Sequence, residues 1–277
     1  MKLSSLIEKI GGRRRGEAAT PPALGEAMRF GYGPFRFKTR LPRGLEYTIQ
    51  ASTDLRTWTV LAKGKAAEET LEYIDSEAFK FTFRFYRVLA GEVHSANVIG
   101  YASVTLAPGF SMIANPFDSS QTVSDIFKDW PEGTGLNKFD TRLFRLVENE
   151  RDSGKWTNPT EKLAPSEGAI FFNPTSDYKS VSFVGEVLQG NLSVPIPAGF
   201  SIRSSLMPKP GHLADDLGFP IGNGDVIHIF DREKQKYVLH PYEDGKWSAG
   251  PPIVSVGESF WVAKADPGNW TVNFQAE

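Results

Sequence analysis

The 277-residue chain is predicted to be all-β, and three observations support this prediction. Nineteen Pro and 26 Gly, spread along the chain, indicate many short strands joined by turns. Several segments, such as residues 35–41 and 79–85, alternate apolar and polar side chains with the period of a strand. Residues 104–186 and 194–277 are two versions of one strand-and-turn design. The predicted order is an N-terminal arm, a β-sandwich and two duplicated β-rich modules.

The composition indicates folded, aromatic-rich cores. Hydrophobic residues make up 40% of the chain, including 20 Phe, 8 Tyr and 6 Trp. The absence of Cys removes disulfides, thiolate metal sites and Cys nucleophiles. No apolar run approaches the length of a membrane span, and Glu8 and Lys9 interrupt the N-terminal stretch where a signal peptide would lie. We expect no membrane span and no secretion signal; localisation stays open, with a cytoplasmically made component of a virion or other particle as the hypothesis.

Residues 1–33 are predicted to form an arm and linker. Four apolar residues at i, i+3, i+4 and i+7 make one stripe of a short helix, which three arginines follow. Because a helix of about ten residues is marginal alone in water, we expect the stripe to dock, either on this chain's own body or on a protein partner, a second copy included. The residues of this docking arm are Leu3, Leu6, Ile7, Ile10, Arg13, Arg14 and Arg15.

Residues 34–98 are predicted to form a small β-domain, with the clearest strand at residues 79–85. The segments Tyr47-Thr-Ile-Gln-Ala-Ser-Thr-Asp-Leu-Arg-Thr-Trp58 and Phe85-Tyr-Arg-Val88 resemble fibronectin-III-like modules of multidomain bacterial surface and secreted proteins. The resemblance implies an Ig-like sandwich that serves as a spacer or a binding module and not as a catalyst. Because this stretch is short for seven strands, we expect the linker to supply one.

Two β-rich repeats are predicted to follow, at residues 99–187 and 188–277. Their early parts align at an offset of 90 residues and their later parts at 91, so a single one-residue gap suffices. The aligned pairs include Gly-Phe-Ser at 109–111 and 199–201, Phe-Asp at 139–140 and 230–231, Gly-Lys-Trp at 154–156 and 245–247, and Glu at 167 and 258. One helical turn is predicted at residues 123–127, with a counterpart at 213–217. The paired repeats also resemble C-terminal regions of the same bacterial proteins, which implies a modular role.

Duplication provides a test for chemistry, because a site that belongs to the module should recur in both copies. The histidines do not recur, and none has the HxH or HExxH spacing of a metal site. The positions aligned with His212, His228 and His240 are Gln121, Asn137 and Asn149. We therefore predict no bound metal and no cofactor.

Two pairs of carboxylates do recur, Glu167 with Glu258 and Asp140 with Asp231. Paired carboxylates can hydrolyse glycosidic bonds if both line one cleft. These residues, however, lie in turns or directly after strands, where a carboxylate accepts backbone N–H bonds. We favour this structural use and predict that the chain is not an enzyme; a glycoside hydrolase is the third hypothesis.

Two groups of residues are candidates for ligand contact. Trp156 and Trp247 recur at hairpin exits, where a ring can stack on a glycan or be buried in a core, while Trp58 and Trp261 lie inside apolar strands and are expected in the core. A candidate face for a polyanion comprises Arg36, Lys38, Arg40, Lys80 and Arg84. Its alternative is a solvated face, or one covered by the acidic repeats.

Charge is distributed unevenly along the chain. Residues 1–99 hold 16 Lys and Arg against 11 Asp and Glu (+5), and residues 100–277 hold 15 against 22 (−7). Such polarity favours head-to-tail contacts or an anionic partner at the N-terminal end. The leading hypothesis is a structural or assembly protein that docks through its arm onto a virion, a surface layer or an injection-type machine. The alternative is a carbohydrate-binding or adhesion module that uses exposed aromatics.

Overall fold

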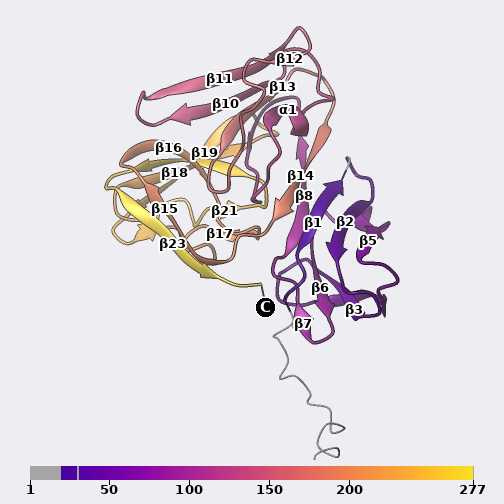
Figure 1. Ribbon diagram of the computed structural model, residues 1–277. Coiled ribbons are helices and arrows are strands. Elements are labelled where there is room, and N and C mark those ends of the chain that lie inside the picture. The colour runs from indigo at the N-terminus through magenta and orange to yellow at the C-terminus, as the bar shows by residue number, and fades with distance from the viewer. Residues whose placement is uncertain (1–19, 30, 277) are drawn as a thin grey trace, which may run out of the picture.

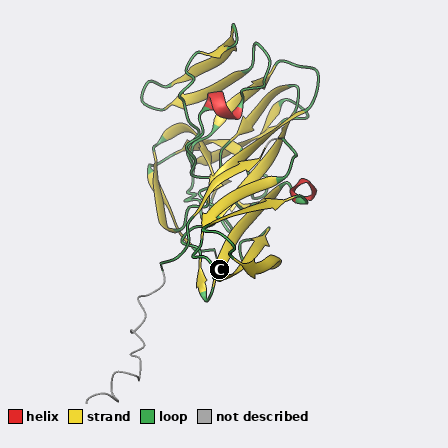
Figure 2. Cartoon of the chain, turned by 45° about the vertical axis from the view of Figure 1, so that its right-hand side comes forward, coloured by secondary structure: helices red, strands yellow, loops and turns green. Residues whose placement is uncertain are grey.

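The computed structural model describes residues 20–29 and 31–276 (Figure 1). Strands make up 52% of the residues and helices 3%, which confirms the all-β prediction. Figure 2 shows how little helix accompanies the strands. The docking arm, Leu3 to Arg15, lies outside the described residues, so what was expected of it stays a prediction.

The N-terminal part is a sandwich of two antiparallel sheets. The smaller sheet has the order β1-β2-β5, and the larger has the order β14-β8-β6-β3-β4, with β7 on β6. Large aromatic side chains from both sheets, Phe35, Phe37, Tyr86 and Tyr101, are fully buried between them. The strands are β1 Leu24–Arg29, β2 Phe35–Arg40, β3 Glu46–Ser52, β4 Thr59–Lys65, β5 Thr70–Asp75, β6 Phe83–Ala90, β7 Val93–His94, β8 Ile99–Leu106 and β14 Lys179–Glu186.

The sandwich extends beyond residues 34–98 on both sides. Strand β1 comes from the stretch predicted as linker, as the shortage of strands led us to expect. Strands β8 and β14, from the first predicted repeat, continue the larger sheet, because β8 pairs with β6 and β14 pairs with β8 along its whole length. The fibronectin-like class of the sandwich and the divisions at residues 33, 98 and 187 stay predictions.

The strand predicted at residues 79–85 is wrong in its first half. A 3₁₀ turn occupies Ala78–Lys80, the strand begins only at Phe83, and Phe79 is 59% exposed. Two buried donors explain the turn: the Tyr101 hydroxyl and the Arg29 guanidinium both bond the Ala78 carbonyl, at 2.7 and 3.2 Å. A buried carbonyl needs such partners, and a continuous strand would direct it elsewhere.

The remaining strands form two five-stranded sheets with the same strand order. The first is β12-β11-β10-β13-β9 and the second is β20-β19-β18-β22-β16. We call the two predicted repeats the first half (residues 99–187) and the second half (residues 188–277). In each half the flanking strands also pair antiparallel, β14 with β8 and β23 with β15. This agreement accords with the aligned sequences, while the duplication itself stays a prediction.

The bounds of these strands follow. In the first half they are β9 Gly109–Ile113, β10 Gly135–Asp140, β11 Arg145–Asp152, β12 Lys155–Trp156 and β13 Ala169–Asn173. In the second they are β15 Gly190–Ile196, β16 Gly199–Ser204, β17 Gly211–His212, β18 Asp225–Asp231, β19 Lys236–Glu243, β20 Lys246–Trp247, β21 Ile253–Val254, β22 Ser259–Lys264 and β23 Gly268–Phe274.

The predicted helical turn is confirmed as α1, Val123–Ile126. It begins with a capping box, in which the Thr122 hydroxyl accepts from the Asp125 N–H and the Asp125 carboxylate accepts from the Thr122 N–H. Its predicted counterpart at residues 213–217 forms turns instead of a helix.

The two halves meet through a pair of matching backbone hydrogen bonds. The Ala114 N–H bonds the Gly257 carbonyl at 2.9 Å, and the Ser204 N–H bonds the Ser166 carbonyl at 3.1 Å. Ala114 aligns with Ser204 at an offset of 90 and Ser166 aligns with Gly257 at 91, so each bond is the counterpart of the other. The halves therefore contact each other as two copies do across a two-fold axis.

Candidate functional site

The recurring glutamates lie where turn chemistry places them. The Glu167 carboxylate accepts from the Ala164 N–H at 3.1 Å, and the Glu258 carboxylate accepts from the Ser255 N–H at 3.0 Å. These two equivalent i to i+3 bonds are the backbone bonds that were expected of the turns, while the structural use of the carboxylates stays a prediction. Glu167 also forms an ion pair with Lys138 at 2.7 Å.

The recurring aspartates have the same kind of partner. The Asp140 carboxylate accepts from the N–H groups of Arg142 and Leu143, at 2.9 and 3.0 Å. The Asp231 carboxylate accepts from the N–H groups of Glu233 and Lys234, at 3.1 and 2.9 Å. The Leu143 N–H lowers the pKa of Asp140, and the Lys234 ammonium with its own N–H lowers the pKa of Asp231.

The basic residues predicted as a polyanion face do not share one surface. Arg36, Lys38 and Arg40 alternate with buried residues along β2 and point outward. Lys38 is paired with Glu26 at 2.6 Å, and Lys80 is paired with Glu77. The outward part of this face is thus partly neutralised by acidic side chains of the same module.

The prediction that Arg84 belongs to that face was wrong, because Arg84 lies in the sandwich core. It is 8% exposed, pairs with Asp75 at 2.7 Å and stacks on the Phe81 ring at 4.1 Å. The Tyr86 hydroxyl donates to the same Asp75 oxygen at 2.6 Å. Burial, with Asp75 beside the hydroxyl, raises the pKa of Tyr86, and burial raises the pKa of Tyr101 to about 12. A charge in this position needs its partner, so the network is structural.

The two recurring tryptophans have different surroundings. Trp156 is 3% exposed and contacts Phe127 in the first core, so the buried alternative is confirmed and the ring offers no face to a glycan. Trp247 is partly buried, packs on the second core and meets the Tyr242 ring edge to face at 5.1 Å. Glycan stacking at Trp247 stays a prediction.

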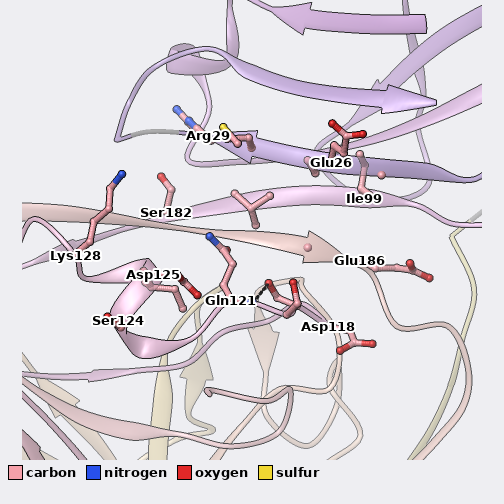
Figure 3. Close-up of a pocket in the computed structure, with 18 of the residues that line it drawn as sticks. Glu26, Arg29, Ile99, Asp118, Gln121, Ser124, Asp125, Lys128, Ser182 and Glu186 are labelled. Carbon is pink, nitrogen blue, oxygen red and sulfur yellow. Dashed lines mark hydrogen bonds between the residues drawn. The ribbon is translucent and has the colours of Figure 1, made fainter. Parts of the chain in front are cut away.

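A polar groove lies between the sandwich and the first half (Figure 3). It encloses about 870 Å³ and is lined by β1, β14 and the α1 turn. Figure 3 labels ten of its residues: Glu26, Arg29, Ile99, Asp118, Gln121, Ser124, Asp125, Lys128, Ser182 and Glu186. The groove offers carboxylate, hydroxyl and amide groups that can hydrogen-bond a polar ligand.

Two of the groove's carboxylates have structural partners. Asp125 caps α1, and the Asn97 amide donates to the Glu186 carboxylate at 2.9 Å. The backbones of Asp118 and Glu186 form a bridge with two bonds of 2.9 Å. Trp130 also lines the groove, but it is 7% exposed and the Lys179 ammonium lies 5.3 Å from its ring centroid. Among the described residues, no three His, Asp or Glu side chains gather as metal ligands.

An aromatic hollow of about 340 Å³ lies where the two halves meet. The rings meet edge to face, with centroids 4.9–6.3 Å apart and interplanar angles of 66–83°. Burial lowers the pKa of the one imidazole among them. The lining consists of Phe139 and Phe144 from the first half and Phe200, His228, Tyr237 and Trp261 from the second.

Unlike an interior cluster, the aromatic hollow is open to solvent. Phe144 is 65% exposed, Phe200 40% and Tyr237 37%. The Trp261 indole N–H donates to the Tyr237 hydroxyl at 3.1 Å, which satisfies its polar group within the wall. Placing Trp261 wholly in the core was wrong, because its strand turns this ring toward the first half.

One signal in the sequence could have located the hollow. At the aligned positions 137, 146 and 170 the first half has Asn, Leu and Ile, where the second has His228, Tyr237 and Trp261. The second half thus has three rings at positions where the first half has none, and this is visible only when the differences between the repeats are compared instead of their shared framework.

A scan of the chain against protein-family models gave no match, and a search of curated proteins gave none either. Within the described part of the chain, no helix is long and apolar enough to cross a membrane.

Proposed function

We propose that the chain is a non-enzymatic structural or assembly protein. Its β modules form a rigid framework, and its N-terminal arm docks onto a larger particle such as a virion, a surface layer or an injection-type machine. The observation that supports this proposal is backbone hydrogen bonding at both junctions: β6 and β8 pair in one sheet between the sandwich and the first half, and two backbone bonds join the first half to the second.

The connection between the sandwich and the first half is a strand pair within one sheet. Strand β8 of the first half pairs with β6 over four residues, from Phe83 opposite Ala102 to Tyr86 opposite Ile99. Modules joined by flexible linkers normally move relative to each other. A shared sheet opposes such motion, because bending it would break ladder bonds.

The connection between the two halves is sterically tight. A Cβ at Gly168 would lie 2.4 Å from the Ser259 Cβ, and a Cβ at Gly257 would lie 2.4 Å from the Val104 side chain. Backbones approach this closely only where glycine removes the side chain. Together with the two matching backbone bonds, these contacts favour a spacer of fixed shape.

The recurring carboxylates support the same proposal. Glu167, Glu258, Asp140 and Asp231 all bond backbone N–H groups of their own turns. What the halves share is therefore used to shape hairpins and turns. Residues 1–19 supply the docking peptide in this proposal, with five Lys and Arg against two Glu beside the apolar stripe.

Deletion of residues 1–15 tests the proposal. We expect the truncated chain to keep the melting temperature of the full chain and to lose co-purification with the particle. Two variants separate the apolar from the charged contribution to docking. One changes the apolar residues Leu3, Leu6, Ile7 and Ile10 to Ser. The other changes Arg13, Arg14 and Arg15 to Gln. Unchanged co-purification after the deletion would remove the proposal.

A further inference from the structure

The aromatic hollow has an equivalent position on the other side of the contact between the halves, where the side chain of Gln235 caps the edge of strand β9. Phe144 aligns with Gln235, and Phe200 aligns with Phe110. The Gln235 side chain accepts from the Phe110 N–H at 2.8 Å and donates to the Phe110 carbonyl at 2.9 Å. A Cβ at Gly109 would meet Gln235 at 2.7 Å, whereas a Cβ at the aligned Gly199 has nothing within 4 Å.

The open copy presents the edge of a strand as well as a hollow. Phe110 lies opposite Phe172, and both of its backbone groups point away from β13 to Gln235. Phe200 lies opposite Ala263 in the same register, so its N–H and C=O also point away from the sheet. No described side chain is bonded to them as Gln235 is to Phe110, so a backbone donor and acceptor are left at the edge of β16, on the residue whose ring lines the hollow.

Phe144 is held in a conformation that is unfavourable for a bulky residue. Its φ is 52°, close to the 51° of Gln235, in the left-handed region that Gly or Asn normally occupies. The exposed ring gains little from burial in return, since 65% of the residue is accessible. The left-handed turn is common to both hairpins; the difference is that Gln235 uses it to bond the Phe110 backbone, whereas Phe144 leaves its ring exposed.

The turn that carries Phe144 is basic. Arg142 and Arg145 flank it in sequence, and both are exposed. Neither lies within ion-pair distance of a carboxylate in the described part of the chain, although the charges of both contribute, after the backbone N–H groups of Leu143 and Arg142, to lowering the pKa of Asp140. An occupant with carboxylates beside its apolar part therefore complements this surface.

We propose that the aromatic hollow is a docking site for a partner protein, entered by an extended segment with an apolar side chain flanked by acidic residues. The apolar side chain fills the ring-lined space, whose volume suits one or two side chains. The segment's backbone pairs with Phe200 at the edge of β16, and its carboxylates meet Arg142 and Arg145. This site lies apart from the N-terminal arm and goes beyond the docking role proposed for it.

Perpendicular ring walls favour this occupant over a sugar. A glycan ring stacks on a flat exposed face and needs polar groups around it, whereas no charged side chain lines the hollow and its Tyr237 hydroxyl already accepts from Trp261. The six rings instead surround a space that an apolar knob can enter, and such central aromatic pockets dominate binding energy in protein interfaces.

Labelled peptides test the site on the full chain by fluorescence polarisation. The probes are acetylated pentapeptides with a central Phe, Leu or Trp flanked by Asp, a second set flanked by Lys, and a third with Ser in the centre. We expect the Asp-flanked apolar set to bind, and the other two sets to bind at least about tenfold more weakly.

Variants then assign the binding to the hollow. Phe200→Ala should weaken it at least about tenfold, and Phe144→Gln should do the same by copying the closure that Gln235 makes. Leu143→Ala, a 50% exposed apolar neighbour in the same turn, and Gln235→Ala in the other half should change binding less than about twofold. Melting temperatures verify that each variant folds.

Four results would overturn the proposal. One is that none of the peptide sets binds the full chain. Another is that Lys-flanked peptides bind as tightly as Asp-flanked ones. The third is that Phe144→Gln and Phe200→Ala bind like the unchanged chain. The fourth is that only soluble oligosaccharides bind, and that these two variants abolish their binding. Loss of the N-terminal arm should leave peptide binding unchanged, which separates this site from the arm.

Discussion

The contact between the two halves makes a quantitative prediction for Gly168→Ala. The added Cβ would lie 2.4 Å from the Ser259 Cβ and 2.5 Å from the Ile202 Cγ2. These neighbours belong to the second half, and Gly168 has no left-handed backbone that could complicate the result. Forcing one methyl group into such a packed contact costs about 1–3 kcal/mol of unfolding free energy. For a chain of this size the upper part of that range lowers the melting temperature by about 5–10 °C.

Other glycines of the chain provide matched controls. Gly25→Ala places its Cβ in open space with an ordinary backbone, so it should stay within about 0.5 kcal/mol of the unchanged chain. Gly154→Ala also enters open space, but at a φ of 77°, so it measures the cost of left-handed backbone alone, about 1–2 kcal/mol. Gly257→Ala combines a φ of 83° with the 2.4 Å approach to Val104 and should exceed both.

Urea denaturation and thermal melts measure these differences. If Gly168→Ala is as stable as Gly25→Ala, the halves yield to the added methyl group and the framework is not rigid at their junction. If Gly168→Ala and Gly257→Ala lose stability while Gly25→Ala does not, the close approach of the two backbones is responsible.

Two further predictions follow from buried and half-buried ionisable groups. Asp75→Asn leaves Arg84 charged and without its ion-pair partner in the core, so it should cost about 3–5 kcal/mol of unfolding free energy. Replacing both residues by apolar ones should recover much of that loss. Equal stability of Asp75→Asn and the unchanged chain would contradict the role of the pair. Burial lowers the pKa of His228 from its ordinary 6.5, so the folded chain binds this proton less readily than the unfolded chain, and stability falls as the pH drops through 6.5 toward the folded pKa. When the pH is lowered from about 7.5 to about 5.5, the melting temperature of His228→Gln should fall less than that of the unchanged chain. An equal fall would show that His228 does not contribute to the pH dependence of stability.

Features that depend on neighbours in sequence were predictable. The turn role of Glu167 follows from a hydrogen bond to the N–H three residues earlier, and the capping box at Thr122 spans the same distance. The alternation along β2 likewise identified its outward face. Such bonds and periodicities are properties of a few consecutive residues, so the sequence contains them without knowledge of the fold.

The candidate binding surface was not predictable in the same way. Arg84 stands in an alternating strand and Trp261 in an apolar one, yet Arg84 is buried beside Asp75 and Trp261 forms a wall of the hollow. A strand has two faces, and only the opposing sheet or module determines which of them meets water.

What the sequence alone determined about this protein is its all-β class, its hairpins and turns, and the alignment of its two halves. What only the tertiary structure decided is how those halves meet, with Ala114 bonded to Gly257 and Ser204 bonded to Ser166. That contact leaves one of two equivalent positions closed by Gln235 and the other open beside Phe144. The physical reason is that burial and shape arise between segments far apart in sequence, such as Phe110 and Gln235, which are 125 residues apart, and no local period or hydrogen bond carries that information.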